Sequence, residues 1–421
     1  MLKEIDNYII CFISLIPFAL ITGPFIPDLL VVLINILVIY QIVKKKYYNY
    51  FNNIFFYLFF IYCFYLILSS LISKNIFLSL ESSLFYFRFG IFALAIWYIL
   101  DNNKSFLKIF KISLLSVFLL LFFDASYQYI TDYNLIGYHY GGNRLSSFFG
   151  DEKKLGNFLV RLLPILLAVI IINDDNYKNK IIFLFFFLFS GFVILISGDR
   201  TALLFYLILI LGFILLINEW FKIKLLIVVL ASFFILFATL SDKNIYNRII
   251  SNTLIMLTAT PDDSKIDLNN PWYFFSKDHH IYILTSYSMF KNNLITGIGP
   301  KNYRVECEDV KYETLNSQLR NINRCNTHPH NTYMQILAET GIIGIIPVLG
   351  VFLLIMYQII IQFLNKLKGS EYISNFKILL YLALMVSLFP VFPSFSFFNN
   401  WISIIYYLPI GFILSKLYQK S

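Results

Sequence analysis

The chain has 421 residues, of which 59% are hydrophobic and only 14% are charged. This is more apolar surface than one soluble core can bury, so the composition excludes a soluble globular protein and predicts helices in contact with lipid. The formal net charge of +9 comes from cations scattered between apolar runs, which argues against a nucleic-acid-binding face and favours residues that orient membrane spans.

Apolar runs of spanning length recur along the chain and predict an all-α integral membrane protein with about twelve transmembrane helices. The first two runs meet at Pro24 without a small-residue cleavage site, so we expect a helical hairpin rather than a signal peptide. The predicted spans are residues 8–22, 25–43, 54–72, 78–100, 107–130, 156–173, 181–197, 201–217, 224–241, 332–363, 374–390 and 400–416.

The distribution of lysines predicts the orientation of these spans. If the N-terminus is cytoplasmic, the short outer loops hold only Lys74, Arg144, Lys153, Lys154 and Arg200. The positive-inside rule therefore favours cytoplasmic N- and C-termini. The inner side then receives Lys3, Lys44, Lys45, Lys46, Lys104, Lys108, Lys111, Lys178, Lys180, Lys222, Lys224, Lys366, Lys368, Lys377, Lys416 and Lys420.

This orientation places one large polar loop on the outer side, between the ninth and tenth spans. It divides the chain into residues 1–241 with nine helices, the loop 242–331, and residues 332–421 with three more helices. A loop of this length and polarity predicts a small folded cap.

Within the loop, Pro261-Asp262-Asp263 indicates a turn, and Trp272 to Phe290 predicts a short amphipathic helix. Cys307 and Cys325 also lie here, where an oxidising compartment permits a disulfide worth roughly 3 kcal/mol. The sequence leaves open whether that bond forms.

Four arginines are candidates for binding a ligand at the outer side of the membrane. Arg88 and Arg161 lie inside predicted spans, where an unpaired cation costs at least ~2.5 kcal/mol, so such residues usually face a polar cavity. Arg144 lies in an outer loop, and Arg200 follows the seventh span, so the topology allows all four to reach one outward-facing cavity. Guanidinium groups at the membrane boundary suit bidentate contact with phosphate.

A structural explanation of these arginines remains open. Arg88 could pair with Glu81, and Arg200 could pair with its neighbour Asp199. Either side chain would then stabilise the fold rather than bind a ligand.

The segment His328-Pro329-His330-Asn331, at the start of the tenth span, is the second candidate site. Pro329 is predicted as the first helical residue, which would place His330 near the positive end of the helix dipole. A neutral His330 could then accept a proton from a hydroxyl as a general base. Helix capping or a place beside a metal is the alternative, but no third ligand supports a metal site. Gly341 and Gly344 downstream indicate close helix packing or a bend.

Three motifs together resemble the O-antigen ligase and polymerase superfamily. His330-Asn331, followed after nine residues by Gly341-x-x-Gly344, resembles the ligase signature. The stretch from Ser197 to Leu204 resembles the Ser-x-x-Arg-Thr turn of the family, and Gly297 to Tyr303 is similar to its glycine-rich segment upstream of the histidine. The resemblance is strongest from about Ser190 to Gly350.

The resemblance implies a metal-independent glycosyltransferase of the bacterial inner membrane, without a cofactor and with a periplasmic active site. Its implied partners are a glycan donor on undecaprenyl diphosphate, a sugar acceptor on lipid A-core or another glycan, and membrane lipid, with no nucleic acid. His330 would be the catalytic base, and Arg200 would stabilise the departing diphosphate. The residues expected to bind substrate are Arg88, Arg144, Arg161, Arg304, His328 and Asn331.

Alternatives to this function remain. We favour a ligase, which uses lipid A-core, over a polymerase, which extends the lipid-linked glycan. A secondary transporter also suits twelve spans with intramembrane arginines, although the long outer loop and the lack of an internal repeat argue against it. A purely structural subunit would leave those arginines without a task. The sequence contains no nucleophile elbow, zinc-protease motif or phosphate-binding loop.

Overall fold

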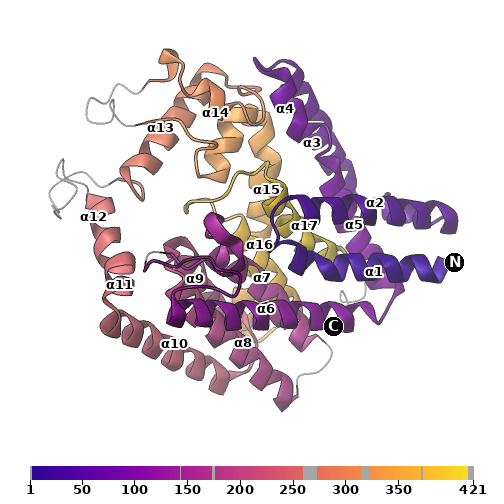
Figure 1. Ribbon diagram of the computed structural model, residues 1–421. Coiled ribbons are helices and arrows are strands. Elements are labelled where there is room, and N and C mark those ends of the chain that lie inside the picture. The colour runs from indigo at the N-terminus through magenta and orange to yellow at the C-terminus, as the bar shows by residue number, and fades with distance from the viewer. Residues whose placement is uncertain are drawn as a thin grey trace.

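The computed structural model describes residues 2–142, 144–172, 176–258, 273–313, 323–370 and 373–415. In these ranges the chain is helical, and the only strand-like pairing is an isolated bridge between Tyr133 and His139. The arrangement is shown in Figure 1.

Every predicted span contains helix. The apolar helices are α1 (Leu2–Ala19), α2 (Phe25–Lys45), α3 (Ile54–Leu71), α4 (Ile76–Ser83), α5 (Phe87–Asn102), α6 (Phe106–Thr131), α7 (Leu155–Ile171), α8 (Tyr177–Ile196), α9 (Arg200–Leu216), α10 (Phe221–Ser241), α15 (Thr332–Lys368), α16 (Asn375–Ser387) and α17 (Asn400–Leu414). Within the described residues, 7 helical stretches are long and apolar enough to cross a membrane, and shorter apolar helices accompany them. The protein is a polytopic membrane protein, and the number of twelve crossings stays a prediction.

The fourth predicted span is two helices rather than one. The break between α4 and α5 follows serines with hydrogen-bonded hydroxyls. Ser83 Oγ donates to the carbonyl oxygen of Ser79 within α4 at 3.0 Å and lies 2.7 Å from Ser70 Oγ, and Ser79 Oγ donates to the carbonyl oxygen of Pro300 at 2.8 Å. Serine side chains compete with helical hydrogen bonding in this way. Arg88 is therefore the second residue of α5, and its predicted place ten residues into a continuous helix is wrong.

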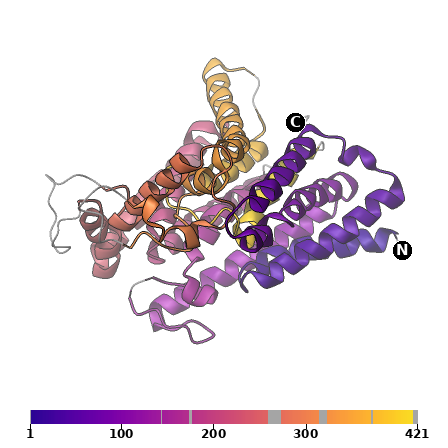
Figure 2. The ribbon, with the colours of Figure 1, turned by 90° about the horizontal axis from the view of Figure 1, so that it is seen from above.

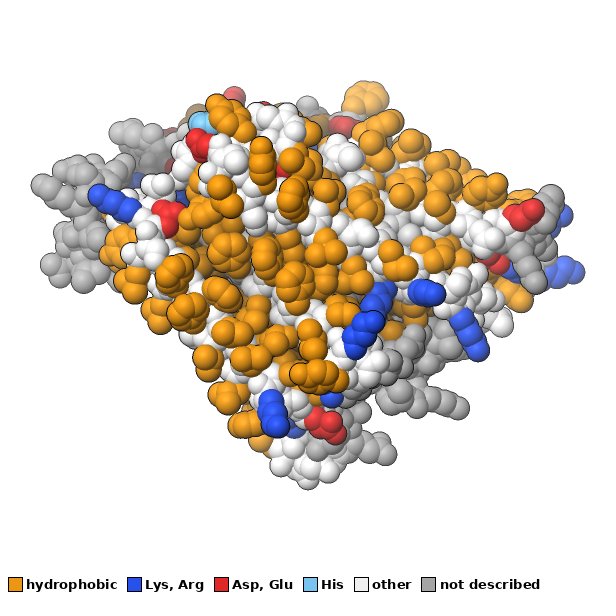
Figure 3. Space-filling model, turned by 60° about the horizontal axis from the view of Figure 1, so that its bottom comes forward, with side chains coloured by type: hydrophobic (Ala, Val, Ile, Leu, Met, Phe, Trp, Pro, Cys, Tyr) orange, Lys and Arg blue, Asp and Glu red, His pale blue; other side chains and the backbone are white. Residues whose placement is uncertain are grey.

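Helices α5, α7, α16 and α17 form the buried centre of the bundle. Every residue of α7 from Leu155 to Ile170 is buried, and α5 and α17 pack so closely that a Cβ at Gly411 would lie 2.6 Å from the carbonyl oxygen of Ala93. The outer helices instead expose apolar side chains, as on α10 with Phe233, 56% exposed, and Leu240, 84% exposed. Figure 3 shows a broad hydrophobic face with lysines and arginines near its edges, as expected for a surface in contact with lipid.

The segment between α10 and α15 folds over one end of the bundle. It contains α11 (Lys243–Tyr246), a π-helical turn (Asn247–Ser251), α12 (Asn252–Thr258), α13 (Lys277–Asn292), α14 (Tyr303–Glu306) and a 3-10 turn (Val310–Tyr312). Helix α13 confirms the predicted amphipathic helix from residue 277 onward. Trp272 and the predicted turn at residues 261–263 lie outside the described residues.

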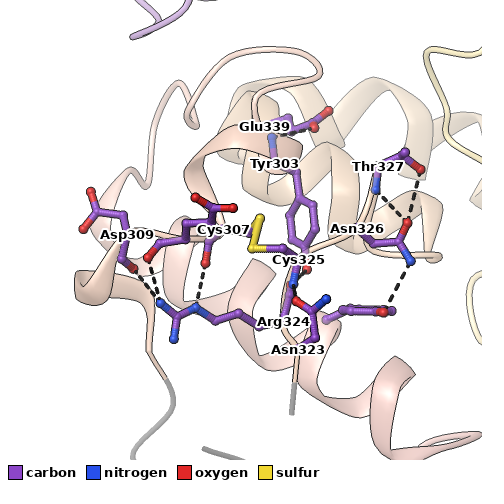
Figure 4. The surroundings of a disulfide bond; sticks show 11 residues. Tyr303, Cys307, Asp309, Asn323, Arg324, Cys325, Asn326, Thr327 and Glu339 are labelled. Carbon is purple, nitrogen blue, oxygen red and sulfur yellow. Dashed lines mark hydrogen bonds between the residues drawn. A yellow bond between two sulfur atoms is a disulfide. The ribbon is translucent and has the colours of Figure 1, made fainter. Parts of the chain in front are cut away.

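The disulfide between Cys307 and Cys325 is formed, which confirms the pairing that the sequence left open. Figure 4 shows how the neighbouring Arg324 reinforces it. The Arg324 guanidinium donates to the carbonyl oxygens of Cys307 at 2.6 Å and Glu308 at 2.9 Å, and the Tyr303 hydroxyl donates to the carbonyl oxygen of Arg324 at 2.8 Å. The bond and these contacts hold the start of the histidine segment against α14.

Two glycines fasten this outer segment to α15. Gly341 interrupts α15 with a φ of 63°, and a Cβ there would lie 2.3 Å from the carbonyl oxygen of Ile295. A Cβ at Gly297, where φ is 68°, would lie 2.4 Å from the backbone carbonyl carbon of Glu339. The backbone N–H of Gly299 then donates to the carbonyl oxygen of Glu339 at 2.8 Å. Gly341 thus produces the predicted bend, because only glycine fits a left-handed conformation at so close an approach.

Candidate functional site

The histidine segment lies just outside α15 rather than in its first turn. Asn331 is the N-cap: its Oδ1 accepts from the N–H of Met334 at 3.0 Å, and its Nδ2 donates to the carbonyl oxygen of Pro390 at 2.8 Å. The prediction of Pro329 as the first helical residue is wrong. His330 adopts a left-handed backbone with φ 54°, which directs its side chain independently of the helix that follows.

His328 is buried, and both of its ring nitrogens have partners. Nε2 lies 3.3 Å from the carbonyl oxygen of Ser394, which can only accept, so Nε2 carries the hydrogen. Nδ1 lies 3.0 Å from the hydroxyl of Thr327 and accepts from it. Burial and the nearby histidines and Arg304 lower the pKa of His328 to about 3. His328 is therefore a neutral residue that positions the loop.

His330 differs from His328 because its imidazole makes no hydrogen bond within the described part of the chain. It is partly exposed, and its ring centroid lies 4.2 Å from that of His328 and 5.9 Å from that of Tyr282. Burial lowers the pKa of His330 below the ordinary histidine value. A neutral imidazole with an available nitrogen can accept a proton from a bound hydroxyl.

The structure brings His279 to this place, which sequence reasoning missed. It lies in the first turn of α13, where Ser276 Oγ accepts from its backbone N–H at 3.2 Å, and its ring centroid is 5.6 Å from that of His330. Burial, His330 and Arg200 together lower the pKa of His279 to about 4. Arg200 thus lies within electrostatic range of the paired histidines.

Arg144, Arg200 and Arg248, which we call the arginine cluster, meet at the turn between α8 and α9. Arg200 contacts Thr253 Oγ1 at 3.3 Å, and Arg248 Nε donates to the carbonyl oxygen of Gly198 at 3.3 Å. Burial and the charge of Arg144 lower the pKa of Arg248, as expected for cations held close together. No pattern around Arg248 in the sequence indicated this role.

Asp199 organises the cluster without pairing to Arg200. Its Oδ2 lies 3.1 Å from Nη2 of Arg144 and 2.7 Å from Nδ2 of Asn157, while Oδ1 caps α9 by accepting from the N–H of Ala202 at 3.2 Å. The proposed ion pair of Arg200 with Asp199 is therefore wrong. One carboxylate among three guanidinium groups leaves the cluster with a surplus of positive charge.

The four arginines predicted to share one cavity do not do so. Arg161 is only 1% exposed, where its Nη1 donates to the carbonyl oxygen of Ser387 at 3.1 Å and its guanidinium lies over Phe205. Arg88 Nε pairs with Asp28 at 2.8 Å, not with Glu81 as considered from the sequence. Of the four, Arg144 and Arg200 belong to the arginine cluster, and Arg161 interacts with the charge of Asp199 from its buried position.

A second polar site lies on the other side of the histidine segment. Lys154, Lys301, Arg304 and His328 line a cavity of about 410 Å³, which we call the lysine cavity. Lys301 lies in the glycine-rich motif, but the sequence did not indicate that it lines a cavity. Its backbone is left-handed, with φ 60°.

Glu339 holds the loop that carries Lys301. Its fully buried carboxylate accepts from the N–H of Tyr303 at 3.1 Å and from Nε2 of Gln335 at 3.0 Å. Gln335 Oε1 in turn accepts from the N–H of Phe397 at 2.8 Å. This network connects both walls of the lysine cavity.

Residues 185–349 match the family model described as O-antigen ligase. The match supports the O-antigen ligase superfamily for this part of the chain. No curated protein sequence matches the chain.

The O-antigen ligase match runs from within α8 to the part of α15 beyond its bend, so it includes Arg200, Arg248, His279 and His330. It supports a function of the general O-antigen ligase and polymerase type. Among the described residues, no group of three or more histidine, cysteine or acidic side chains is arranged to hold a metal ion.

Proposed function

We propose that the protein transfers a glycan from undecaprenyl diphosphate to a sugar hydroxyl, at the periplasmic face of a bacterial inner membrane. The observation that carries the proposal is the pairing of His330, whose imidazole makes no hydrogen bond among the described residues, with His279, whose ring lies within electrostatic range of Arg200. A proton acceptor next to a cationic cluster suits a reaction that deprotonates a nucleophile and releases an anion. The O-antigen ligase match over residues 185–349 supports the same reaction class.

In the proposed reaction, the neutral His330 imidazole accepts the proton of the acceptor hydroxyl as its oxygen attacks the anomeric carbon of the donor sugar. The bond between that carbon and the diphosphate oxygen breaks, and the electron pair leaves with the diphosphate. Arg144, Arg200 and Arg248 stabilise the developing negative charge in place of a divalent cation. Attack from the face opposite the leaving group inverts the anomeric centre.

The other residues predicted to bind substrate divide by their contacts. Arg304 and Arg88 line cavities, so both are retained as substrate-binding residues. Three others donate hydrogen bonds to carbonyl oxygens of residues 387–394: His328, Asn331 and Arg161. We therefore assign these three to positioning that segment and the loop that carries His330.

Lipid A-core is the first candidate acceptor, because the matched family is described as O-antigen ligase. Polymerisation is the second candidate, and the lysine cavity favours it, since a second cationic site beside His328 suits a second anionic substrate. On either proposal, the N- and C-termini are cytoplasmic.

Purified protein in a lipid bilayer tests the reaction. It would receive an undecaprenyl-diphosphate glycan with either lipid A-core or a second lipid-linked glycan, and the product size would be followed with and without a chelator. A single new linkage on lipid A-core indicates a ligase, and chain extension indicates a polymerase.

We expect His330→Ala to abolish transfer. His139→Ala is the matched control, because His139 is exposed and pairs with Asp132 at 2.9 Å outside the site. Near-normal transfer by His330→Ala would remove the base assignment. Solute transport that persists with both His330 and Arg200 replaced would instead favour a transporter.

A further inference from the structure

Two separate cationic sites flank the histidine segment, although one leaving diphosphate requires only one. The arginine cluster lies within electrostatic range of His279, whose ring is 5.6 Å from that of His330. The lysine cavity lies on the side of His328, which lines it. The rings of His328 and His330 are 4.2 Å apart, so a group bound in the lysine cavity lies near the proposed base. The second site needs a ligand of its own.

The charge of the lysine cavity predicts an anionic ligand. Its lining contains three cations, Lys154, Lys301 and Arg304, and no carboxylate. Lys154 and Lys301 each have an acidic side chain nearby, Glu152 and Glu81 respectively. Arg304 is exposed, and its side chain forms no ion pair or hydrogen bond within the described part of the chain. A guanidinium left available in a cavity suits a phosphate oxygen.

A mainly apolar groove continues from this cavity, and its lining also contains the charged residues Asp28, Glu81 and Arg88. The groove has a volume of about 500 Å³ and shares Lys301 and Asn400 with the lysine cavity. One wall is the face of α2 formed by Val32, Ile36 and Ile39, residues spaced by one helical turn, and the facing wall comes from Phe85, Phe87 and Ile91.

The groove is open at the surface of the protein, because the side chains of Ile36 and Phe85 are 59% and 55% exposed. A path therefore runs from the histidines through cations to an apolar surface. The volume of the groove suits part of one hydrocarbon chain rather than several acyl chains side by side.

We propose that the lysine cavity and this groove bind the lipid carrier of the acceptor glycan, a second polyprenyl diphosphate, while the arginine cluster holds the diphosphate of the donor. The inference rests on the proposed glycan transfer, and it selects the polymerase candidate over lipid A-core. The headgroup lies against Lys301 and Arg304, the first part of the prenyl chain lies along α2, and the acceptor sugar extends past His328 toward His330.

Binding stoichiometry tests this proposal without requiring transfer. Native mass spectrometry of the full chain would count molecules of glycan-free undecaprenyl diphosphate bound. We expect two per wild-type chain and one for the double variant Lys301→Gln/Arg304→Gln, which removes charge-assisted contacts and weakens that site by at least about tenfold. Arg200→Gln/Arg248→Gln should also bind one, and the combined variant none. Lys291→Gln is the control, since Lys291 lies over Tyr287 on α13 and outside both sites, and it should bind two.

A groove variant separates the lipid tail from the headgroup. Ile36→Trp fills the groove from an exposed position, so it should weaken the second undecaprenyl diphosphate at least tenfold and leave the short geranyl diphosphate unaffected. One lipid per wild-type chain overturns the proposal, as does displacement of the second lipid by lipid A-core. Two bound lipids without any glycan transfer would instead overturn the proposed reaction, and glycan transfer by a wild-type chain that binds one lipid would overturn this inference alone.

Discussion

Replacing Cys307 and Cys325 with serine should loosen the segment that carries His330, the proposed base. The disulfide closes a loop with a sequence separation of 18, which corresponds to about 3 kcal/mol. A change of that size raises the open population of the outer segment more than about a hundredfold. Cys325 is three residues before His328, so opening should separate the lysine cavity from the histidines and lower the transfer rate.

Hydrogen exchange in reconstituted bilayers measures this opening directly. Peptides covering residues 303–312 and 323–330 should exchange faster in the double serine variant, and peptides from the buried α7 should not change. Arg324 keeps its bonds to the carbonyl oxygens of residues 307 and 308 in the variant, so the segment should open more often without becoming unfolded. Cys11→Ser is the control, because Cys11 is free and exposed. Wild-type exchange and wild-type transfer in the double variant would refute the reasoning.

Three further outcomes are expected. Burial lowers the pKa of His330, so the neutral base persists as the pH falls through about 6.5. The acid limb of a profile of kcat/KM against pH should therefore lie below that pH. An acid limb above it would contradict the assignment of His330 as the base. Gly341→Ala should lower the free energy of unfolding by at least about 1–2 kcal/mol, because φ is 63° and the new Cβ meets Ile295. Gly350→Ala is the control, because Gly350 is helical with open space around it, so the same thermal unfolding assay should show no loss of stability. Glu339→Ala leaves the backbone N–H of residue 303 without its acceptor, which should lower the free energy of unfolding by about 1–3 kcal/mol. Hydrogen exchange in residues 299–306 should become faster. Unchanged exchange would count against the network.

Hydropathy located the helices because apolar runs and lipid contact are local properties of the sequence. The bend at Gly341 was also predictable, since a glycine inside an apolar helix commonly marks a bend or a close approach. The break between α4 and α5 was missed because it depends on where serine hydroxyls bind, and Ser79 bonds to Pro300, more than two hundred residues away.

The site was predicted in part. The choice of Arg200 and His330 followed from the family resemblance and the topology, and their roles stay predictions. The ion pairs were wrong because they were chosen among sequence neighbours, while Asp199 binds Arg144 and Arg88 binds Asp28 across the fold. His279 was missed for the same reason, since only the packing of α13 against α15 brings it to His330.

The length of α15 has a mechanical consequence. Beyond its bend at Gly341, α15 continues for the 27 residues from Ile342 to Lys368, which correspond to about 40 Å at 1.5 Å per residue and exceed a hydrocarbon core of about 30 Å. Figure 2 shows its far end projecting from the remainder of the bundle, where Leu354 and Leu367 are exposed. The other end begins at the cap residue Asn331, next to the proposed base. A thinner or thicker bilayer that tilts this helix would therefore move one wall of the site, so the thickness of the surrounding membrane should tune the reaction.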